Sequence, residues 1–171
     1  MKTVLIAYAS RMGSTQEIAS AIGDRLADRG FAVEVVPAAD AAGARDFDAV
    51  LLGSAVYLGR WEKEAISYLK REATALGERP TWLFQSGPSG PASEARRTGT
   101  PRVVKRLCRS IGLAEPTTFG GNLDPARAKG RLARWVSKGD LAGDFRDWEQ
   151  IRSWADDVAD QLGADQPAAG A

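Results

Sequence analysis

The residues best suited to chemistry lie in a hydroxyl-rich loop near the N-terminus. Residues 10–15 read Ser-Arg-Met-Gly-Ser-Thr, and they join a short apolar run to a segment with helical spacing. The free amides of the first helical turn would face this loop, at the positive end of the helix dipole. With the hydroxyls of Ser10, Ser14 and Thr15, they would hold a phosphate dianion. The loop is therefore predicted to bind phosphate, with Arg11 as its one cation; the alternative is an ordinary connection in which Ser14 or Thr15 caps the helix.

The composition of this loop excludes three other kinds of site. A nucleoside triphosphatase loop needs a second glycine followed by a lysine, and a dinucleotide fingerprint needs three glycines, whereas this loop has Gly13 alone. A receiver domain would need carboxylates at the end of the first strand, where this chain has Tyr8, Ala9 and Ser10. A single terminal phosphate held mainly by hydroxyls and amides remains, and flavin mononucleotide (FMN) fits that description.

The chain contains no histidine, which removes the commonest general base and the commonest metal ligand. No C-x-x-C pair or carboxylate cluster indicates a metal, so none is expected. A flavin brings its own redox chemistry and the protein need only position it, so no catalytic residue is assigned. The single cysteine, Cys108, lies among Val104, Leu107 and Ile111, and we expect a buried apolar residue rather than a reactive thiol.

Apolar strands alternate with amphipathic helices along the chain, which is typical of a parallel α/β fold. The predicted strands are Val4–Tyr8, Ala32–Val36, Ala49–Gly53, Thr81–Gln85 and a strand near Thr117–Gly120. The predicted helices are Ser14–Arg29, Glu62–Leu76, Arg102–Ile111 and Trp148–Leu162, with a short stretch at Ala41–Arg45. Five strands with the phosphate loop after the first match a doubly wound parallel sheet of order 2-1-3-4-5 with helices on both faces. Its ligand would lie at the carboxyl ends of strands one, three and four.

A second loop follows the third predicted strand and carries aromatic residues. From residue 53 the chain reads Gly-Ser-Ala-Val-Tyr-Leu-Gly-Arg-Trp. Small residues let backbone approach a ligand, and aromatic side chains can cover a flat ring. Tyr57 is the first candidate for contact with a flavin ring and Trp61 the second. The alternatives are an exposed loop tyrosine and a tryptophan packed on the domain.

Residues 10–15 resemble the [ST]-x-[TX]-G-x-T phosphate loop of the flavodoxin family, with Met12 where many flavodoxins carry a third hydroxyl. The resemblance implies a flavodoxin-like fold, FMN as cofactor, and a loop after the fourth strand that lines the flavin. That loop, at residues 86–88, has no aromatic residue, which implies a flavin face open to a substrate. The predicted FMN contacts are Ser10, Arg11, Met12, Gly13, Ser14, Thr15, Ala55, Val56, Tyr57, Leu58, Gly59, Ser86, Gly87 and Pro88.

Over nearly its whole length, the chain resembles the quinone-dependent protoporphyrinogen IX dehydrogenase type of flavodoxin-fold protein. The residues that carry this likeness are YASRMGSTQEIA from Tyr8, GSAVYLGRWEKEA from Gly53, GGNLD from Gly120 and DWEQI from Asp147. The resemblance implies an FMN-dependent oxidoreductase that oxidises a reduced anionic aromatic substrate, such as the porphyrinogen protoporphyrinogen IX, with a quinone as acceptor. The alternatives are a flavodoxin-type electron carrier that docks on redox partners and a flavodoxin-like module without flavin.

The length of 171 residues fits one domain. We expect that domain over residues 1–163, with insertions at about 87–101 and 122–145 and a flexible C-terminal tail at 164–171. No apolar run is long enough to span a membrane, and the first strand begins at Thr3, which leaves no room for a leader. We therefore expect a cytoplasmic protein.

Charge is distributed very unevenly along the chain. Between Arg96 and Lys138 there are eleven basic and two acidic residues, a net charge of +9, whereas the whole chain carries +1. Such a segment would attract an anionic porphyrin, a lipid surface or an acidic protein. The stretch from Arg127 to Lys138 would make peripheral contact with the inner face of the membrane; the alternative is a solvated face with Trp135 packed inward. No nucleic-acid-binding motif accompanies the charge, so no nucleic acid partner is expected.

Overall fold

Five parallel strands form the central sheet of the structure, a computed structural model that describes residues 1–87, 99–123 and 143–164. These strands are β1 (Thr3–Ala9), β2 (Ala32–Pro37), β3 (Ala49–Tyr57), β5 (Thr81–Ser86) and β6 (Thr117–Phe119). Their order is β2-β1-β3-β5-β6, which confirms the predicted doubly wound order. In the register of the sheet, Ile6 of β1 lies between Val35 of β2 and Leu51 of β3.

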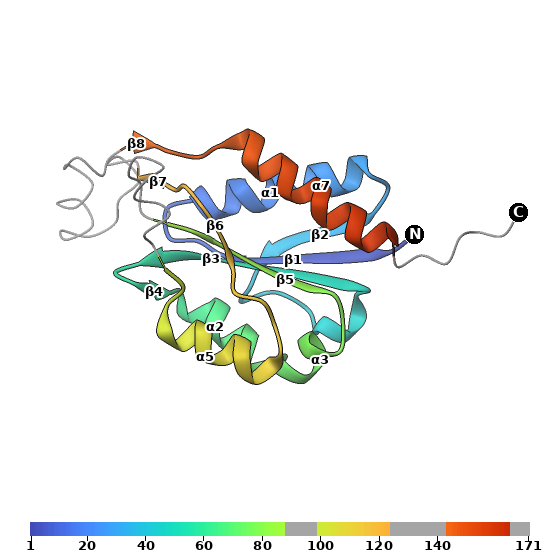
Figure 1. The fold of residues 1–171 in the computed structure, drawn as a ribbon, viewed down its shortest axis with the longest axis horizontal. Coiled ribbons are helices and arrows are strands. Elements are labelled where there is room, and N and C mark those ends of the chain that lie inside the picture. The colour runs from blue at the N-terminus through green and yellow to red at the C-terminus, as the bar shows by residue number, and fades with distance from the viewer. Residues whose placement is uncertain (88–98, 124–142, 165–171) are drawn as a thin grey trace, which may run out of the picture.

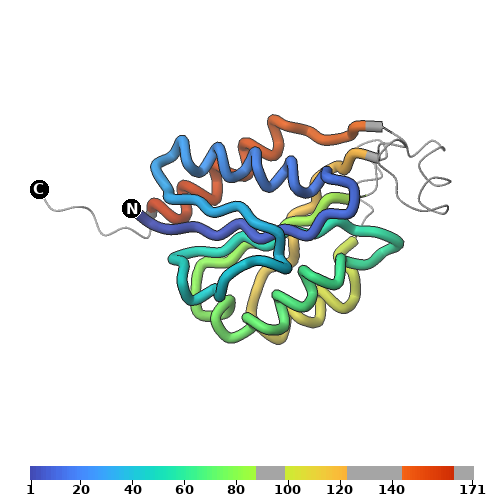
Figure 2. The backbone as a smooth tube through the Cα atoms, turned by 180° about the vertical axis from the view of Figure 1, so that it is seen from behind, coloured from blue at the N-terminus to red at the C-terminus, as the bar shows by residue number. Residues whose placement is uncertain are grey.

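Helices cover both faces of the sheet (Figures 1 and 2). One face carries α1 (Ser14–Asp28) and α7 (Trp148–Ala164). The other carries α2 (Lys63–Arg71), α3 (Ala73–Gly77) and α5 (Arg102–Ile111), with a short 3-10 helix, η1 (Ala44–Asp46), beside them. In the part of the chain that the structure describes, no helix is both long enough and apolar enough to cross a membrane.

Each face of the sheet has its own apolar core because strand side chains alternate between the faces. On β1, Val4 and Ile6 join the core under α1 and α7, while Leu5 and Ala7 join the core under α2 and α5. All four side chains are fully buried, as expected of a central strand covered on both faces. The predicted burial of Cys108 is also confirmed, and burial raises the pKa of its thiol.

The structure differs from the predicted elements at two places. Strand β3 continues past Gly53 to Tyr57, because Gly53 leaves room for the ring of Phe84; a Cβ there would lie 2.1 Å from that ring. The single helix expected over 62–76 is broken at Glu72 into α2 and α3. The carboxylate of Glu72 turns away to accept the backbone N–H of Ala44 at 3.0 Å.

The carboxyl ends of the strands meet at the edge of the sheet that carries the candidate site. A hairpin formed by β3 and β4 (Arg60–Trp61) lies at this edge, as does an antiparallel ribbon of β7 (Asn122–Leu123) and β8 (Gly143–Asp144) (Figure 1). Ala164, the first residue of the predicted tail, belongs to α7. Several predicted features lie outside the described residues: Pro88, most of both predicted insertions, the basic stretch 127–138 with Trp135, and residues 165–171.

Candidate phosphate and flavin site

The phosphate loop turns at Gly13, directly before α1. Gly13 has φ 89° and ψ −12°, a left-handed conformation that glycine adopts without steric cost. Its N–H donates to the hydroxyl oxygen of Ser10 at 3.0 Å, which closes the loop. The first backbone bond of α1 runs from the N–H of Glu17 to the carbonyl of Gly13 at 3.0 Å. The amides of residues 14–16 therefore stand ahead of the intrahelical bonds.

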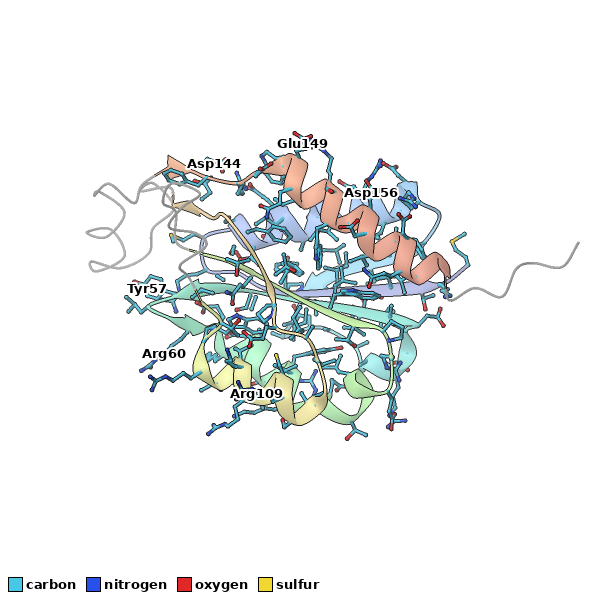
Figure 3. The ribbon with its side chains drawn as sticks, viewed as in Figure 1. Tyr57, Arg60, Arg109, Asp144, Glu149 and Asp156 are labelled. Carbon is cyan, nitrogen blue, oxygen red and sulfur yellow. The ribbon has the colours of Figure 1, made fainter. Side chains whose placement is uncertain are left out.

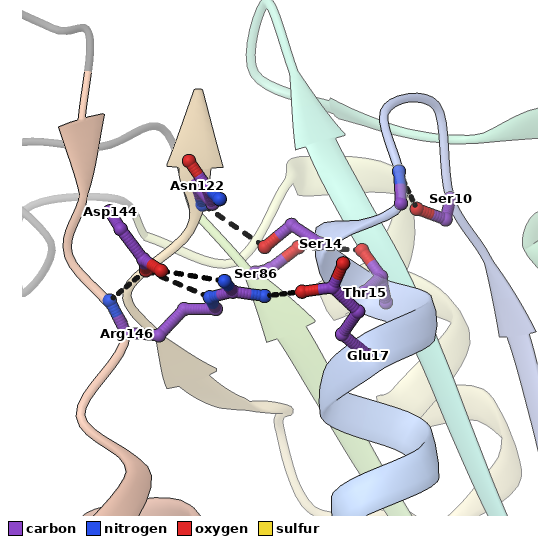
Figure 4. A network of polar contacts seen from close by, with 9 residues as sticks. Ser10, Ser14, Thr15, Glu17, Ser86, Asn122, Asp144 and Arg146 are labelled. Atoms are coloured by element: carbon purple, nitrogen blue, oxygen red, sulfur yellow. Dashed lines mark hydrogen bonds and ion pairs between the residues drawn. The ribbon is translucent and has the colours of Figure 1, made fainter. Parts of the chain in front are cut away.

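No side chain caps the start of α1, so the alternative in which Ser14 or Thr15 serves only as a helix cap is wrong. The hydroxyl oxygen of Ser14 instead accepts the backbone N–H of Asn122 at 3.0 Å, which ties β7 to the helix (Figure 4). In these bonds both Ser10 and Ser14 act as acceptors, so each hydroxyl still has a proton to donate. The loop thus presents amide and hydroxyl donors, which suit an anion.

The third predicted hydroxyl, that of Thr15, lies inside the protein. Thr15 is fully buried, and its Oγ1 lies 2.6 Å from the Oγ of Ser86, which is 3% exposed. This bond joins the first turn of α1 to the end of β5 and brings two of the predicted loops together. In this arrangement the pair of hydroxyls holds the two elements in register.

The second predicted loop is a tight β-hairpin rather than an irregular loop. Tyr57 pairs with Arg60 across the hairpin, and the two residues between them, Leu58 and Gly59, have φ of 49° and 70°. Two positive φ values in succession are typical of a type I′ turn, which prefers asparagine and glycine. Leu58 nevertheless occupies the first position, and 68% of its surface is exposed. Leu58 is therefore an apolar side chain held in an unfavourable backbone conformation at an exposed tip.

Arg11 connects the phosphate loop to this hairpin. Its guanidinium lies 4.2 Å from the centre of the Tyr57 ring and forms an ion pair with Glu62, with Nε 3.1 Å from the carboxylate. One face of Tyr57 is thereby covered, so the ring can offer a flat ligand one face at most. Figure 3 shows Tyr57 and Arg60 at the same end of the molecule as Asp144 on β8.

The remaining residues of the second loop are largely internal. Trp61 is 6% exposed, and its indole N–H donates to the side-chain oxygen of Gln85 at 2.9 Å. The alternative for Trp61, a tryptophan packed on the domain, is therefore confirmed. Val56 is 7% exposed and belongs to the same core, and Ala55 is half-buried beside it. Met12 of the phosphate loop is also half-buried.

The third predicted loop begins where three backbone segments meet closely. The N–H of Gly87 donates to the carbonyl of Phe119 at 3.0 Å. A Cβ on Gly121 would lie 2.1 Å from the carbonyl oxygen of Gly87, and one on Gly120 would lie 2.0 Å from that of Phe145. Only glycine permits this packing, which brings the ends of β5 and β6 against the chain entering α7.

Arg146 holds the α7 side of the site together, and the sequence analysis missed it. Its guanidinium donates to the two carboxylate oxygens of Asp144 at 2.8 and 2.6 Å and to the carboxylate of Glu17 on α1 (Figure 4). The side chain is only 6% exposed, and it lies 4.6 Å from the centre of the Trp148 ring. We call Arg146, Asp144 and Glu17 the arginine clamp. The sequence did contain a signal for Arg146, because this arginine lies between Asp144 and Asp147 just before a predicted helix.

The arginine clamp changes the acidity of its members. The hydrogen bond from Arg146 holds the pKa of the Asp144 carboxyl below its ordinary value, against the opposing effect of partial burial. The hydrogen bonds that Arg146 donates to Asp144 and Glu17 raise the pKa of Arg146. Arg146 and Asp144 are therefore both charged at neutral pH, and the clamp joins β8 to the helix that begins at the phosphate loop.

Two hollows border these residues. One of about 320 Å³ lies against the phosphate loop, with Ser10, Arg11 and Gly13 on one side and residues 37–39 on the other. Another of about 620 Å³ lies at the hairpin, lined by residues that include Arg11, Tyr57 and Leu58. Arg11 borders both. The structure thus brings residues 10–15, 55–59 and 86–87 to one edge of the sheet, while Pro88 lies outside the described residues.

Several solved structures share this fold. A flavodoxin from the domain Archaea has a TM-score of 0.62 at 13% identity, over 94% of this chain and 99% of that chain. A WrbA-like flavodoxin from Agrobacterium tumefaciens has a TM-score of 0.60 at 14% identity, over 97% of this chain and 100% of its own. Rubredoxin oxygen:oxidoreductase from Desulfovibrio gigas has a TM-score of 0.64 at 18% identity, over 96% of this chain and 37% of its own. At these identities the likeness concerns the fold alone.

Comparison of the sequence itself with known proteins is more specific. No curated protein sequence matches the chain. The sequence model described as the flavodoxin domain, however, matches residues 5–129, and proteins of this family bind FMN. These comparisons give no evidence for the protoporphyrinogen dehydrogenase subfamily, so membership of that subfamily stays a prediction. Because the match covers most of the chain and includes the phosphate loop, the hairpin and the end of β5, the chain belongs to the flavodoxin domain family.

Proposed function

We propose that the chain holds FMN at the carboxyl ends of β1, β3 and β5 and works as an FMN-dependent oxidoreductase. The observation that carries this is the uncapped start of α1, where the hydroxyls of Ser10 and Ser14 keep protons to donate. Amide and hydroxyl donors at a helix start fit the phosphate dianion of FMN. Tyr57, Leu58 and Gly87 lie at the same edge of the sheet and would contact the flavin ring.

Bound FMN would supply the redox chemistry, since its ring accepts and releases electrons or hydride. The residues of the chain contribute position and charge. The bond between Thr15 and Ser86 fixes the start of α1 against β5. The ion pair with Glu62 holds Arg11 over Tyr57, and because Arg11 borders both hollows its charge would lie near both the phosphate and the ring of FMN. No residue is needed as an acid or base.

We infer further that the redox substrate is a reduced anionic aromatic molecule. Helix α5 contains four basic residues and no acidic residue, and a surface of one sign attracts ligands of the other. Protoporphyrinogen IX, with a quinone as acceptor, is the pair implied by the resemblance described above. Peripheral contact with a membrane surface, where a quinone would be found, belongs to the same proposal.

The FMN proposal is tested by comparing FMN with riboflavin, which lacks the phosphate. Ser14→Ala should weaken FMN binding about tenfold, because a hydrogen bond to a charged group is lost. Riboflavin binding should change less than about twofold. Ser20→Ala is the matched control, because Ser20 is an exposed serine on the same helix. Fluorescence titration gives each dissociation constant, and equal losses for both ligands would contradict a phosphate site at Ser14.

The substrate proposal needs a separate experiment. FMN-loaded protein should oxidise protoporphyrinogen IX under anaerobic conditions when menaquinone is present, with protoporphyrin fluorescence as the readout. Absence of turnover, combined with reversible reduction of the bound flavin, would favour the electron-carrier alternative. A purified protein that fails to bind added FMN would contradict both readings and leave a module without flavin.

A further inference from the structure

A hollow of about 830 Å³ lies beside the candidate flavin site. It is formed between two segments that are distant in sequence, residues 59–67 of the hairpin and α2, and residues 99–104 at the start of α5. The hairpin residues Arg60 and Trp61 also line the hollow at Tyr57. Its volume is within the range of pockets that bind small organic molecules.

Apolar side chains line much of this hollow. Trp61 is 6% exposed and presents only an edge to the hollow, and the fully buried Val104 lies beneath the lining. Ile66 of α2 is half-buried and also lines the hollow. Val103 lies on α5 with 43% of its surface exposed, which is unusually high for a large apolar residue of this chain. A lining of this kind favours a ligand with an apolar body.

Charged residues of one sign complete the lining. Arg60, Lys63 and Arg102 all border the hollow, and none of the described residues that line it is acidic. Lys63 forms a 3.9 Å ion pair with Glu64, which borders the different hollow at the phosphate loop. Within the part of the chain that the structure describes, Arg60 and Arg102 form no ion pair. The positive charge of these two arginines is therefore not balanced by a described carboxylate in direct contact.

The start of α5 departs from the usual charge pattern of a helix. Acidic residues normally occupy the first turn, where they complement the positive end of the dipole. Here the first residue is Arg102, the first turn contains no acidic residue, and no side chain caps the helix. Local violations of this kind are expected where a site requires them. The cavity and its unneutralised cations, rather than the helix start, are what indicate a ligand.

We propose that this hollow binds a small anionic molecule with a flat apolar body, of the class of aromatic carboxylates. The apolar part would pack on Trp61, Ile66 and Val103, and the carboxylate would face Arg60 and Arg102. The site lies beside the hairpin that bears Tyr57 and Leu58, so its ligand would be a neighbour of the flavin ring. The proposal does not rest on FMN binding, and it is tested on the full chain with and without FMN.

The test uses two probes of nearly equal shape, 2-naphthoate and its neutral analogue 2-naphthamide. In a two-dimensional NMR titration, 2-naphthoate should shift the amides of Ser67, Thr100, Val103 and Val104. It should bind at least about fivefold more tightly than the amide, because only the carboxylate can pair with the cations. Equal affinity of the two probes would overturn the proposal, as would shifts confined to other parts of the molecule.

A variant pair locates the site by charge. Val103→Glu places a carboxylate in the lining, and it should raise the dissociation constant of 2-naphthoate about tenfold or more. The variant should fold, because an acidic residue in the first turn of a helix is favourable. Arg109→Gln is the matched control: it lies exposed on the same helix, outside the hollow, and makes the same change in net charge. An equal loss of affinity in both variants would show a general charge effect and overturn the assigned site.

The FMN measurements keep this proposal separate from the proposed function. Val103→Glu should leave the dissociation constant of FMN within about twofold of the unmodified chain. Binding of 2-naphthoate by a protein that fails to bind FMN would support the hollow and contradict the flavin proposal. Binding of FMN without any specific binding of 2-naphthoate would support the flavin proposal and contradict the assignment of the hollow.

Discussion

The candidate site has two sides: one next to α1 and α7, here called the α1 side, and one at the β3–β4 hairpin, here called the hairpin side. Each side contains an arginine, but the two arginines are held differently. Arg146 is 6% exposed and is held by two carboxylates from separate elements. Arg11 is 44% exposed and is held by one carboxylate and one ring face. A buried, multiply bonded charge fixes geometry and is costly to break, whereas an exposed pair contributes little to stability. We infer from this difference that the α1 side keeps the site rigid, whereas the hairpin side would contact the flavin ring.

Disruption of the close packing on the α1 side should have the largest effect. In Gly121→Ala, the new Cβ would lie 2.1 Å from the carbonyl oxygen of Gly87, so backbone must move. We expect a loss of about 3 kcal/mol in the free energy of unfolding, at the upper end for overpacking. Urea denaturation measures it. Gly163→Ala on α7 is the control, because nothing lies near its Cβ, and it should be neutral or stabilising.

Removal of the buried arginine should have the next largest effect. Arg146→Ala leaves Asp144 and Glu17 without their shared partner, and we expect a loss of about 2 kcal/mol because both carboxylates are partly exposed. FMN binding should weaken as well, since Glu17 lies on the helix that would hold the phosphate and its negative charge would no longer be balanced by Arg146. The exposed Arg152 on α7 provides the control variant Arg152→Ala. Equal free energies of unfolding for Arg146→Ala and Arg152→Ala would contradict the inference that Arg146 makes the α1 side rigid.

The hairpin side should respond in the opposite direction. Leu58→Asn replaces an unfavourable left-handed leucine by a residue that the turn prefers, and it should stabilise the fold by about 1 kcal/mol. Gly59→Ala, at the adjacent positive φ, should destabilise it by a similar amount. Urea denaturation gives both values. If Leu58 contacts the flavin ring, Leu58→Asn should also weaken FMN binding. An unchanged free energy of unfolding in Leu58→Asn would contradict backbone strain at the tip of the hairpin.

The smallest effect should come from acid acting on the Asp144 carboxyl of the α1 side. Because the folded protein holds the pKa of Asp144 below its ordinary value of 3.8, the charged carboxylate stabilises the fold above that value. The contribution is lost as the pH falls through the lowered pKa. The difference in unfolding free energy between the unmodified chain and Asp144→Asn should thus be largest at neutral pH and should shrink as the pH falls below 3.8. A difference independent of pH would assign the effect to shape rather than charge.

Much of the fold could be predicted because local patterns coincide with tertiary ones in its central part. The apolar run at residues 4–7 and the helical spacing after Ser14 required no knowledge of the rest of the chain. The extension of β3 could not be read in this way, because Gly53 suggests a loop until the ring of Phe84 is seen to occupy its missing side chain. The helix break at Glu72 likewise depends on a distant amide, that of Ala44.

The candidate site was predicted unevenly for the same reason. Residue types predicted the phosphate loop, and the structure brings the predicted second loop, which forms the hairpin, and the end of β5 to the same edge. Sequence alone did not show that Thr15 and Ser86 bond to each other, since this depends on strand order. It gave no role to Arg146, whose partner Glu17 is separated from it by most of the chain. Pairings that are distant in sequence are what a single sequence specifies least directly.

The ribbon of β7 and β8 has a consequence for how the chain can change. Because Leu123 and Gly143 pair with each other, the segment between them leaves and rejoins the domain at almost the same point. The entropy of closing a loop rises only slowly with its length. A change in the number of residues between Leu123 and Gly143 should therefore cost little loop-closure entropy, provided that the ribbon remains paired. This makes the ribbon a natural junction for grafting new specificities beside an unchanged phosphate loop.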